Sequence, residues 1–228
     1  MGKCLFITGT GTDVGKTYAT GLIVKKLRES GKNAGYYKAA VSGAGKDAKG
    51  RLLPGDAMYV NELAGLRAPV SELVSYVYHD AVSPHLAARI SGQPMNFDRI
   101  AEDFRKARER YDFLAMEGSG GIVCPLRWDE KERVGLDDLV VRLGIPVLVV
   151  ALAGLGTINA TVLTVEHLRG RKIPVKGILL NRFHPGDVME EDNLRMVEEM
   201  TGVPVVAKIW EKDRELDMDA EALAALYD

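Results

Sequence analysis

The sequence predicts an α/β fold in which a mostly parallel sheet of about seven strands is flanked by helices. Short apolar runs of strand length alternate with runs of helical period along most of the chain, a pattern typical of parallel α/β proteins. The first apolar run leads directly into the glycine-rich segment Gly9–Thr17 and then into a helical pattern. Because parallel strands end at a common edge of the sheet, we expect ligands at that edge.

Composition favours a single domain that spans residues 1–228. With 46% hydrophobic residues in a chain of 228, the protein can bury a full core. The formal net charge is −2, from 30 basic and 32 acidic residues, so the sequence lacks the excess of positive charge that proteins binding nucleic acid or anionic membranes usually have. We therefore expect small-molecule partners, with no nucleic acid and no membrane.

Cysteine usage and hydropathy favour a cytoplasmic protein. Cys4 and Cys124 are far apart and form no C-x-x-C motif, which fits a reducing compartment. We expect no secretory signal, because the chain opens directly into a strand. The most apolar run, residues 145–155, contains proline and glycine and is too short for a membrane helix.

The first third of the chain predicts two strands, a helix and a long loop. Strands are expected at residues 4–7 and 34–38, with Lys38 ending the second, and a helix at 18–28 between them. Residues 39–55 are rich in Gly, Ala and Lys and have no apolar period, so they are expected to form a loop. Loops of this length in compact domains are usually functional or mobile.

The rest of the chain continues the alternation of strands and helices. Further strands are expected at 74–78, 113–116, 147–152, 175–180 and 203–209. Further helices are expected at 56–66, from Ser83–Pro84 onward, at 96–110, 158–168, 190–200 and 220–227. The charged run 128–133 is expected to be a solvated loop.

The segment Gly9–Thr17 has the properties of a phosphate-binding loop. Its glycines let backbone N–H groups face a polyphosphate, Lys16 adds a positive charge, and Thr17 offers a hydroxyl to Mg²⁺. The spacing from Gly9 to Gly15 is one residue longer than usual, since Thr10 stands where the common pattern has glycine. A nucleoside triphosphate is the expected ligand, and a glycine-rich turn without ligand is the alternative.

Charged side chains follow other predicted strands. Glu117 ends an apolar strand before Gly118–Gly121, which suits an Mg²⁺ ligand or, alternatively, a cap on that turn. Lys38 is expected beside Lys16 at the end of an adjacent strand, where two cations would stabilise an anion unless Lys38 is simply solvated. From spacing alone, Asp56 is explained as part of a helix start.

Two further segments at strand ends are candidates for ligand contacts. Thr157 to Asn159 begin a predicted helix after two glycines, so their N–H groups can hold a carboxylate, although a plain helix cap explains them equally well. Asn181 follows a buried strand and can read a base edge. The residues after Asn181 do not form the Asn-Lys-x-Asp pattern of guanine-binding proteins, which favours adenine.

Several blocks in a fixed order resemble the dethiobiotin synthetases, a family with the P-loop NTPase fold, over nearly the whole chain. The blocks are Phe6–Thr17, Tyr37–Lys38 with Ser42–Gly43, Gly55–Asp56, Ser83–His85, Glu117–Gly121, Leu155–Asn159 and Asn181. Each block alone occurs in other ATPases. The longer phosphate loop followed by Ser-Pro-His and Leu-Gly-Thr-Ile-Asn is specific to this family.

The resemblance implies an ATP-dependent ligase of biotin biosynthesis that uses Mg²⁺ and takes ATP as co-substrate. Such an enzyme carboxylates 7,8-diaminononanoate (7,8-diaminopelargonate) with CO₂ and closes the ring of dethiobiotin. A carbamate and a carbamic-phosphoric anhydride are the implied intermediates, and ADP and phosphate are released. The family also implies a homodimer with shared active sites.

The resemblance assigns roles to individual residues. Lys16 and Lys38 would be catalytic, and Thr17, Asp56 and Glu117 would hold the metal. Substrate would be bound by Thr12, Lys38 and Ser42 and, from the partner subunit, by the segment matching Gly156, Thr157, Ile158 and Asn159. ATP would be bound by Asp13, Val14, Gly15, Lys16, Thr17, Tyr18, Asp56, Glu117, Gly118, Ser119, Gly120, Asn181, Arg182, Trp210, Glu211 and Lys212.

The chain departs from the family pattern at a few positions and leaves alternatives open. Ala39 stands where the family usually has proline after the lysine, Asp13 stands where the family often has glutamate, and Arg182 and Trp210 replace residues near the base. These changes leave the nucleotide preference open. The alternative functions are a partitioning-type ATPase switch, which often carries an extra lysine early in the loop that this chain lacks, and another small-molecule kinase.

Overall fold

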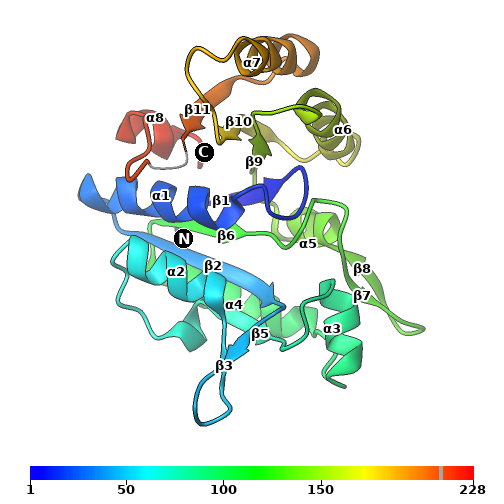
Figure 1. Cartoon of the computed structure of the whole chain (residues 1–228). Coiled ribbons are helices and arrows are strands. Elements are labelled where there is room, and N and C mark those ends of the chain that lie inside the picture. The colour runs from blue at the N-terminus through cyan, green and yellow to red at the C-terminus, as the bar shows by residue number, and fades with distance from the viewer. Residues whose placement is uncertain (211–212) are drawn as a thin grey trace.

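The computed structural model describes residues 1–210 and 213–228, and its central feature is one seven-stranded sheet. The strands are β1 (Lys3–Gly9), β2 (Ala34–Val41), β5 (Val74–Val77), β6 (Phe113–Glu117), β9 (Val147–Leu152), β10 (Val175–Asn181) and β11 (Val205–Ile209). Their order is β11–β10–β9–β1–β6–β2–β5, and every neighbouring pair is parallel. The predicted α/β sheet of about seven strands is confirmed (Figure 1).

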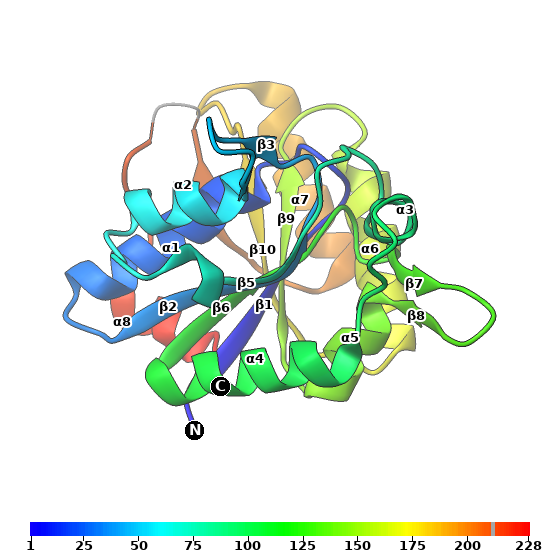
Figure 2. The same cartoon turned by 90° about the horizontal axis from the view of Figure 1, so that it is seen from below.

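Helices cover both faces of the sheet. They are α1 (Lys16–Glu29), α2 (Gly55–Leu63), α3 (Pro84–Ile90), α4 (Phe97–Arg110), α5 (Leu136–Leu143), α6 (Thr157–Gly170), α7 (Val188–Thr201) and α8 (Ala220–Ala225), with a 3₁₀ turn at Val70–Glu72. One core cluster joins helices α1, α2 and α8 to one face of the sheet. A second cluster joins helices α3, α4, α5, α6 and α7 to the opposite face (Figure 2). The chain thus forms three layers.

The central strands are buried on both faces, which explains their continuous apolar sequences. In β1, Leu5 and Ile7 pack in the cluster with α1, whereas Cys4 and Phe6 pack in the opposite one. None of the helices in the described part of the chain combines the length and apolarity needed to cross a bilayer.

Two expectations about Lys38 are wrong. Strand β2 continues to Val41, because Ala40 and Val41 pair with Tyr76 and Val77 of β5, so Lys38 lies within the strand rather than at its end. Strand β6 also lies between β1 and β2, so the strands of Lys16 and Lys38 are not adjacent. The strand that separates them is the one that carries Glu117.

Three local elements were not predicted. The expected loop 39–55 contains the end of β2 and a small antiparallel pair, β3 (Gly45–Lys46) and β4 (Leu52–Leu53). The expected loop 128–133 is the tip of a hairpin formed by β7 (Pro125–Trp128) and β8 (Arg133–Gly135). Helix α5 follows at once, and Asp138 starts it by accepting a hydrogen bond from Gly135 N.

Gly35 is needed in β2 because an aromatic ring packs directly on its backbone. A Cβ atom there would lie 2.2 Å from Cδ2 of Tyr111. We expect Gly35→Ala to lower the free energy of unfolding by about 1–3 kcal/mol, since the core must shift to admit the methyl group. Urea denaturation measures this change.

Gly170→Ala is the matched control, because a Cβ atom at the end of α6 meets nothing within 4 Å. Its effect should stay within about 0.5 kcal/mol. Equal midpoints for the two variants would contradict the packing argument.

Candidate active site

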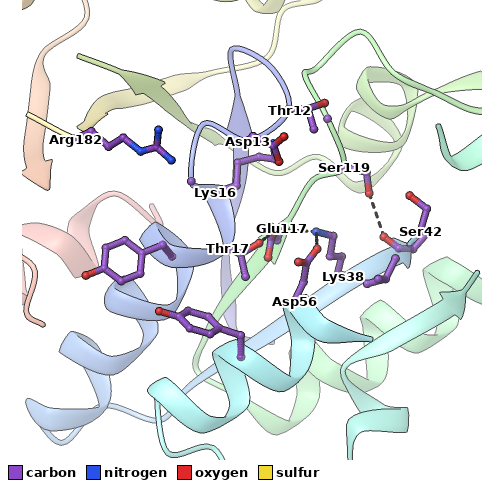
Figure 3. A pocket seen from close by; sticks show the side chains of 16 residues that line it. Thr12, Asp13, Lys16, Thr17, Lys38, Ser42, Asp56, Glu117, Ser119 and Arg182 are labelled. Carbon is purple, nitrogen blue, oxygen red and sulfur yellow. Dashed lines mark hydrogen bonds and ion pairs between the residues drawn. The ribbon is translucent and has the colours of Figure 1, made fainter. Parts of the chain in front are cut away.

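A cleft of about 750 Å³ lies at the carboxyl edge of the sheet, beside the glycine-rich loop (Figure 3). It gathers most of the predicted site residues. Its lining residues are Thr12, Asp13, Gly15, Lys16, Thr17, Tyr18, Lys38, Ala40, Val41, Ser42, Asp56, Tyr59, Glu117, Ser119, Gly120 and Arg182.

The glycine-rich loop is held in a defined shape by its own contacts. Gly15 has φ +92°, and a Cβ atom there would lie 2.0 Å from Nδ2 of Asn181, so glycine is required. Asn181 Nδ2 donates to Val14 O over 2.9 Å, and Lys16 Nζ donates to Gly11 O over 2.8 Å. The buried side-chain amide of Asn181 therefore holds the backbone of the loop in place.

Glu117 is the centre of the polar network in the cleft. It ends β6 opposite Lys38 of β2, and only 1% of its side chain is exposed. Its Oε1 accepts hydrogen bonds from Thr17 Oγ1 at 2.7 Å and from Lys38 Nζ at 2.6 Å. Lys38 Nζ also lies 2.5 Å from Asp56 Oδ2, so one ammonium group joins two carboxylates (Figure 3).

The two lysines respond differently to this environment. Burial alone would lower the pKa of Lys38, but the charges of Glu117 and Asp56 raise that pKa above its ordinary value. Burial lowers the pKa of Lys16, and the nearby charge of Lys38 lowers it further. A bound anion would oppose the lowering at Lys16, so the pair is suited to hold a polyphosphate.

The oxygen atoms beside Lys38 fit a hard divalent cation. Thr17 contributes a hydroxyl, and Glu117 and Asp56 contribute carboxylates, from α1, β6 and α2. Among the described residues there is no group of three or more His, Cys, Asp and Glu that can hold a metal ion. Two carboxylates with one hydroxyl match Mg²⁺, which usually completes its shell with water and phosphate oxygens.

Two tyrosines belong to the site and were missed in the sequence. Tyr36 is buried in β2, and its hydroxyl donates to Glu117 Oε2 over 2.8 Å. Tyr59 of α2 lines the cleft with its ring centroid 6.4 Å from that of Tyr18. The available signals were the i, i+2 spacing of Tyr36 and Lys38 on a strand and the i, i+3 spacing of Asp56 and Tyr59 on a helix.

Some predicted site residues do not line the cleft. Val14, Gly118 and Asn181 are not among the lining residues of the cleft. Trp210 borders a separate depression of about 400 Å³, and the centroid of its ring lies 6.4 Å from that of His184. Glu211 and Lys212 lie outside the described residues.

The predicted carboxylate site at the start of α6 also lies apart from the cleft of its own chain. Gly156, Thr157, Ile158 and Asn159 are not among the lining residues. Leu155, which precedes them, is 91% exposed.

Structural comparison identifies the fold. The chain resembles a ParA family ATPase from Chlorobium tepidum with TM-score 0.54 at 12% identity, covering 100% of this chain and 89% of the other. It resembles a chain of the MinC:MinD cell division protein complex of Aquifex aeolicus with TM-score 0.54 at 13% identity, covering 93% of this chain and 83% of the other. At these identities the likeness concerns the fold alone.

Sequence comparison identifies the family. A family model described as an AAA domain matches residues 3–217. ATP-dependent dethiobiotin synthetase BioD of Brachyspira hyodysenteriae is 43% identical over 228 residues, which is 100% of both chains. The enzyme of the same name from Clostridium perfringens is 46% identical over 209 residues, 92% of this chain and 91% of the relative. The chain belongs to the ATP-dependent dethiobiotin synthetase family.

Proposed function

We propose that this protein carboxylates 7,8-diaminononanoate with CO₂ and closes the ring to dethiobiotin, using ATP and Mg²⁺. Family membership supports the reaction, because the relatives carry the name of that enzyme. The observation that carries the proposal is the Lys38 ammonium, held by Glu117 and Asp56 beside the phosphate loop. This arrangement suits transfer of a phosphoryl group to a carboxylate-like acceptor.

The proposed reaction has three steps. One amine of the substrate attacks CO₂, forms a C–N bond and loses a proton, which gives a carbamate. A carbamate oxygen attacks the γ-phosphorus of ATP, and ADP leaves, which gives a carbamic-phosphoric anhydride. The second amine attacks the carbonyl carbon, loses a proton and expels phosphate, because phosphate leaves far more readily than the oxygen of a free carbamate.

The residues of the cleft divide this work. The N–H groups of the loop and Lys16 hold the phosphates, and Lys38 stabilises the negative charge shared by the carbamate and the γ-phosphate. Thr12 and Ser42 contact the diamine or the carbamate. Thr17, Asp56 and Glu117 would hold Mg²⁺, which when bound neutralises charge on the phosphates.

The nucleoside is proposed to lie toward Arg182. Arg182 and Ser42 border opposite ends of the cleft (Figure 3), so a triphosphate on the loop separates the base from the diamine. Tyr18, Asn181 and Trp210 are also proposed to contact ATP. Glu211 and Lys212, outside the described residues, are further proposed ATP contacts.

The protein is further proposed to act in the cytoplasm as a homodimer with shared active sites. Leu155, just before α6, and Leu163, on α6, are 91% and 61% exposed, and Leu155 directly precedes the proposed carboxylate site at Gly156–Asn159. That site would then complete the cleft of the partner subunit. Cys4 and Cys124 are free thiols, which fits a reducing compartment. The likeness to partitioning ATPases concerns the fold and does not support a switch function.

We expect ¹⁴C-bicarbonate to enter an acid-stable product only when diaminononanoate, ATP and Mg²⁺ are all present. Each omission should abolish the product, because each supplies an atom or a charge that the three steps require. Folded protein that released phosphate from ATP but fixed no label would contradict the proposed function.

We expect Lys38→Met to lower kcat by about 10²–10³-fold, since a charge that stabilises the transition state is removed. The substitution also leaves buried Glu117 without its ammonium partner, at a cost of about 3–5 kcal/mol. Turnover is therefore measured per folded molecule, with folding followed by circular dichroism.

Lys106→Met is the control for that variant, because Lys106 is exposed on α4. A Lys38 variant with normal turnover per folded molecule would show that this lysine is only structural.

We expect Leu155→Glu to weaken the dimer about tenfold or more and to reduce turnover at low protein concentration. Sedimentation velocity measures the dissociation constant. Ile90→Glu is the control, because Ile90 is an exposed apolar side chain on α3. A wild-type protein that sediments as a monomer at every concentration would contradict the shared site.

A further inference from the structure

Tyr36 occupies a position in the sheet that directs its hydroxyl to the carboxylate of Glu117. Tyr36 pairs in register with Ala115 of β6, two residues before the pair formed by Lys38 and Glu117. Tyr36 and Lys38 therefore lie on the same face of β2.

The hydrogen bonds of Glu117 are divided between its two oxygen atoms. Oε1 accepts from Thr17 Oγ1 and Lys38 Nζ, which belong to the proposed metal and phosphoryl site. Oε2 accepts from Tyr36 Oη at 2.8 Å, and no other described side chain donates to it. The plane of the carboxylate is thus fixed by donors on both sides.

The phenol of Tyr36 can act only as a donor in this setting. Tyr36 is fully buried, and burial together with the negative charges of Glu117 and Asp56 holds its pKa well above the ordinary range. A neutral hydroxyl facing an ionised carboxylate gives a charge-assisted hydrogen bond. The hydrogen bond from Tyr36 to Glu117 is therefore stronger than one between two neutral groups.

We infer that Tyr36 is a positioning residue that orients the Glu117 carboxylate as a ligand for Mg²⁺. The inference rests on the proposed function, which assigns Mg²⁺ to Thr17, Asp56 and Glu117. Groups that orient the ligands of a metal commonly control its affinity and the activity it supports. Tyr36 contributes this orientation without lining the cleft.

The neighbouring Tyr37 provides a matched control. Tyr37 is also fully buried, but it lies in the core cluster on the opposite face of the sheet. Its hydroxyl forms hydrogen bonds with Ser75 Oγ at 2.6 Å and Ile100 O at 3.2 Å. Tyr36→Phe and Tyr37→Phe thus each delete one buried, hydrogen-bonded hydroxyl from the same strand, and only the first concerns Glu117.

The test measures Mn²⁺ binding in the presence of ADP by electron paramagnetic resonance. We expect Tyr36→Phe to weaken Mn²⁺ binding roughly 10- to 100-fold, with ADP affinity in the absence of metal unchanged. Tyr37→Phe should bind Mn²⁺ like wild type, even if its melting temperature falls as far. In turnover assays, Tyr36→Phe should need more Mg²⁺ for half-maximal rate while KM for the diamine stays constant.

The outcomes separate the inference from the function on which it rests. Wild-type protein that bound no Mn²⁺ with ADP would contradict the metal site itself. Equal Mn²⁺ affinities for wild type and Tyr36→Phe would overturn only the role of Tyr36.

If Tyr36→Phe does not fold, a crystal structure of the wild type with Mn²⁺ and ADP decides the matter. Retention of the Tyr36–Glu117 hydrogen bond beside the bound metal supports the role. A separation of the two oxygens beyond about 3.5 Å overturns it.

Discussion

The ion pair between Lys38 and Glu117 is the interaction on which the candidate active site depends. Removing both charges from water costs several kcal/mol for each ion, and the attraction between them offsets this cost only with good geometry and further hydrogen bonds. Those bonds are present: Thr17 and Tyr36 donate to Glu117, and Asp56 accepts from Lys38. The pair and its hydrogen bonds therefore connect the starts of α1 and α2 with strands β2 and β6.

The strand order makes this pair possible. Because β6 lies between β1 and β2, its last residue reaches the phosphate loop on one side and Lys38 on the other. Ser119 strengthens the junction by donating to Ala40 O over 3.0 Å. A sheet in which β1 and β2 were neighbours would bring the two lysines together without the carboxylate of Glu117 between them, so that less negative charge would offset their repulsion.

Much of the fold and part of the site could be predicted from the sequence, and the failures have physical causes. The seven strands were found because buried strands have a strong apolar signature, and Glu117 was found because it ends one of them. The neighbours of Lys38 were predicted wrongly because strand order depends on contacts between distant segments. Helix α5 was missed because Leu136–Leu143 is short and follows a hairpin with little apolar pattern. Tyr36 was missed because a buried tyrosine in an apolar strand resembles core packing until its hydroxyl has a partner.

The contact between Lys16 Nζ and Gly11 O has a consequence for ligand discrimination. The Lys16 ammonium already donates a hydrogen bond to Gly11 O, a carbonyl of its own loop, at 2.8 Å. A ligand that displaces this carbonyl therefore gains only the difference in strength between the new hydrogen bond and the old one. A neutral oxygen gains almost nothing by this exchange, whereas a negatively charged phosphate oxygen adds the attraction between opposite charges to the hydrogen bond. The contact between Lys16 and Gly11 therefore favours binding of highly charged ligands over binding of neutral polar metabolites.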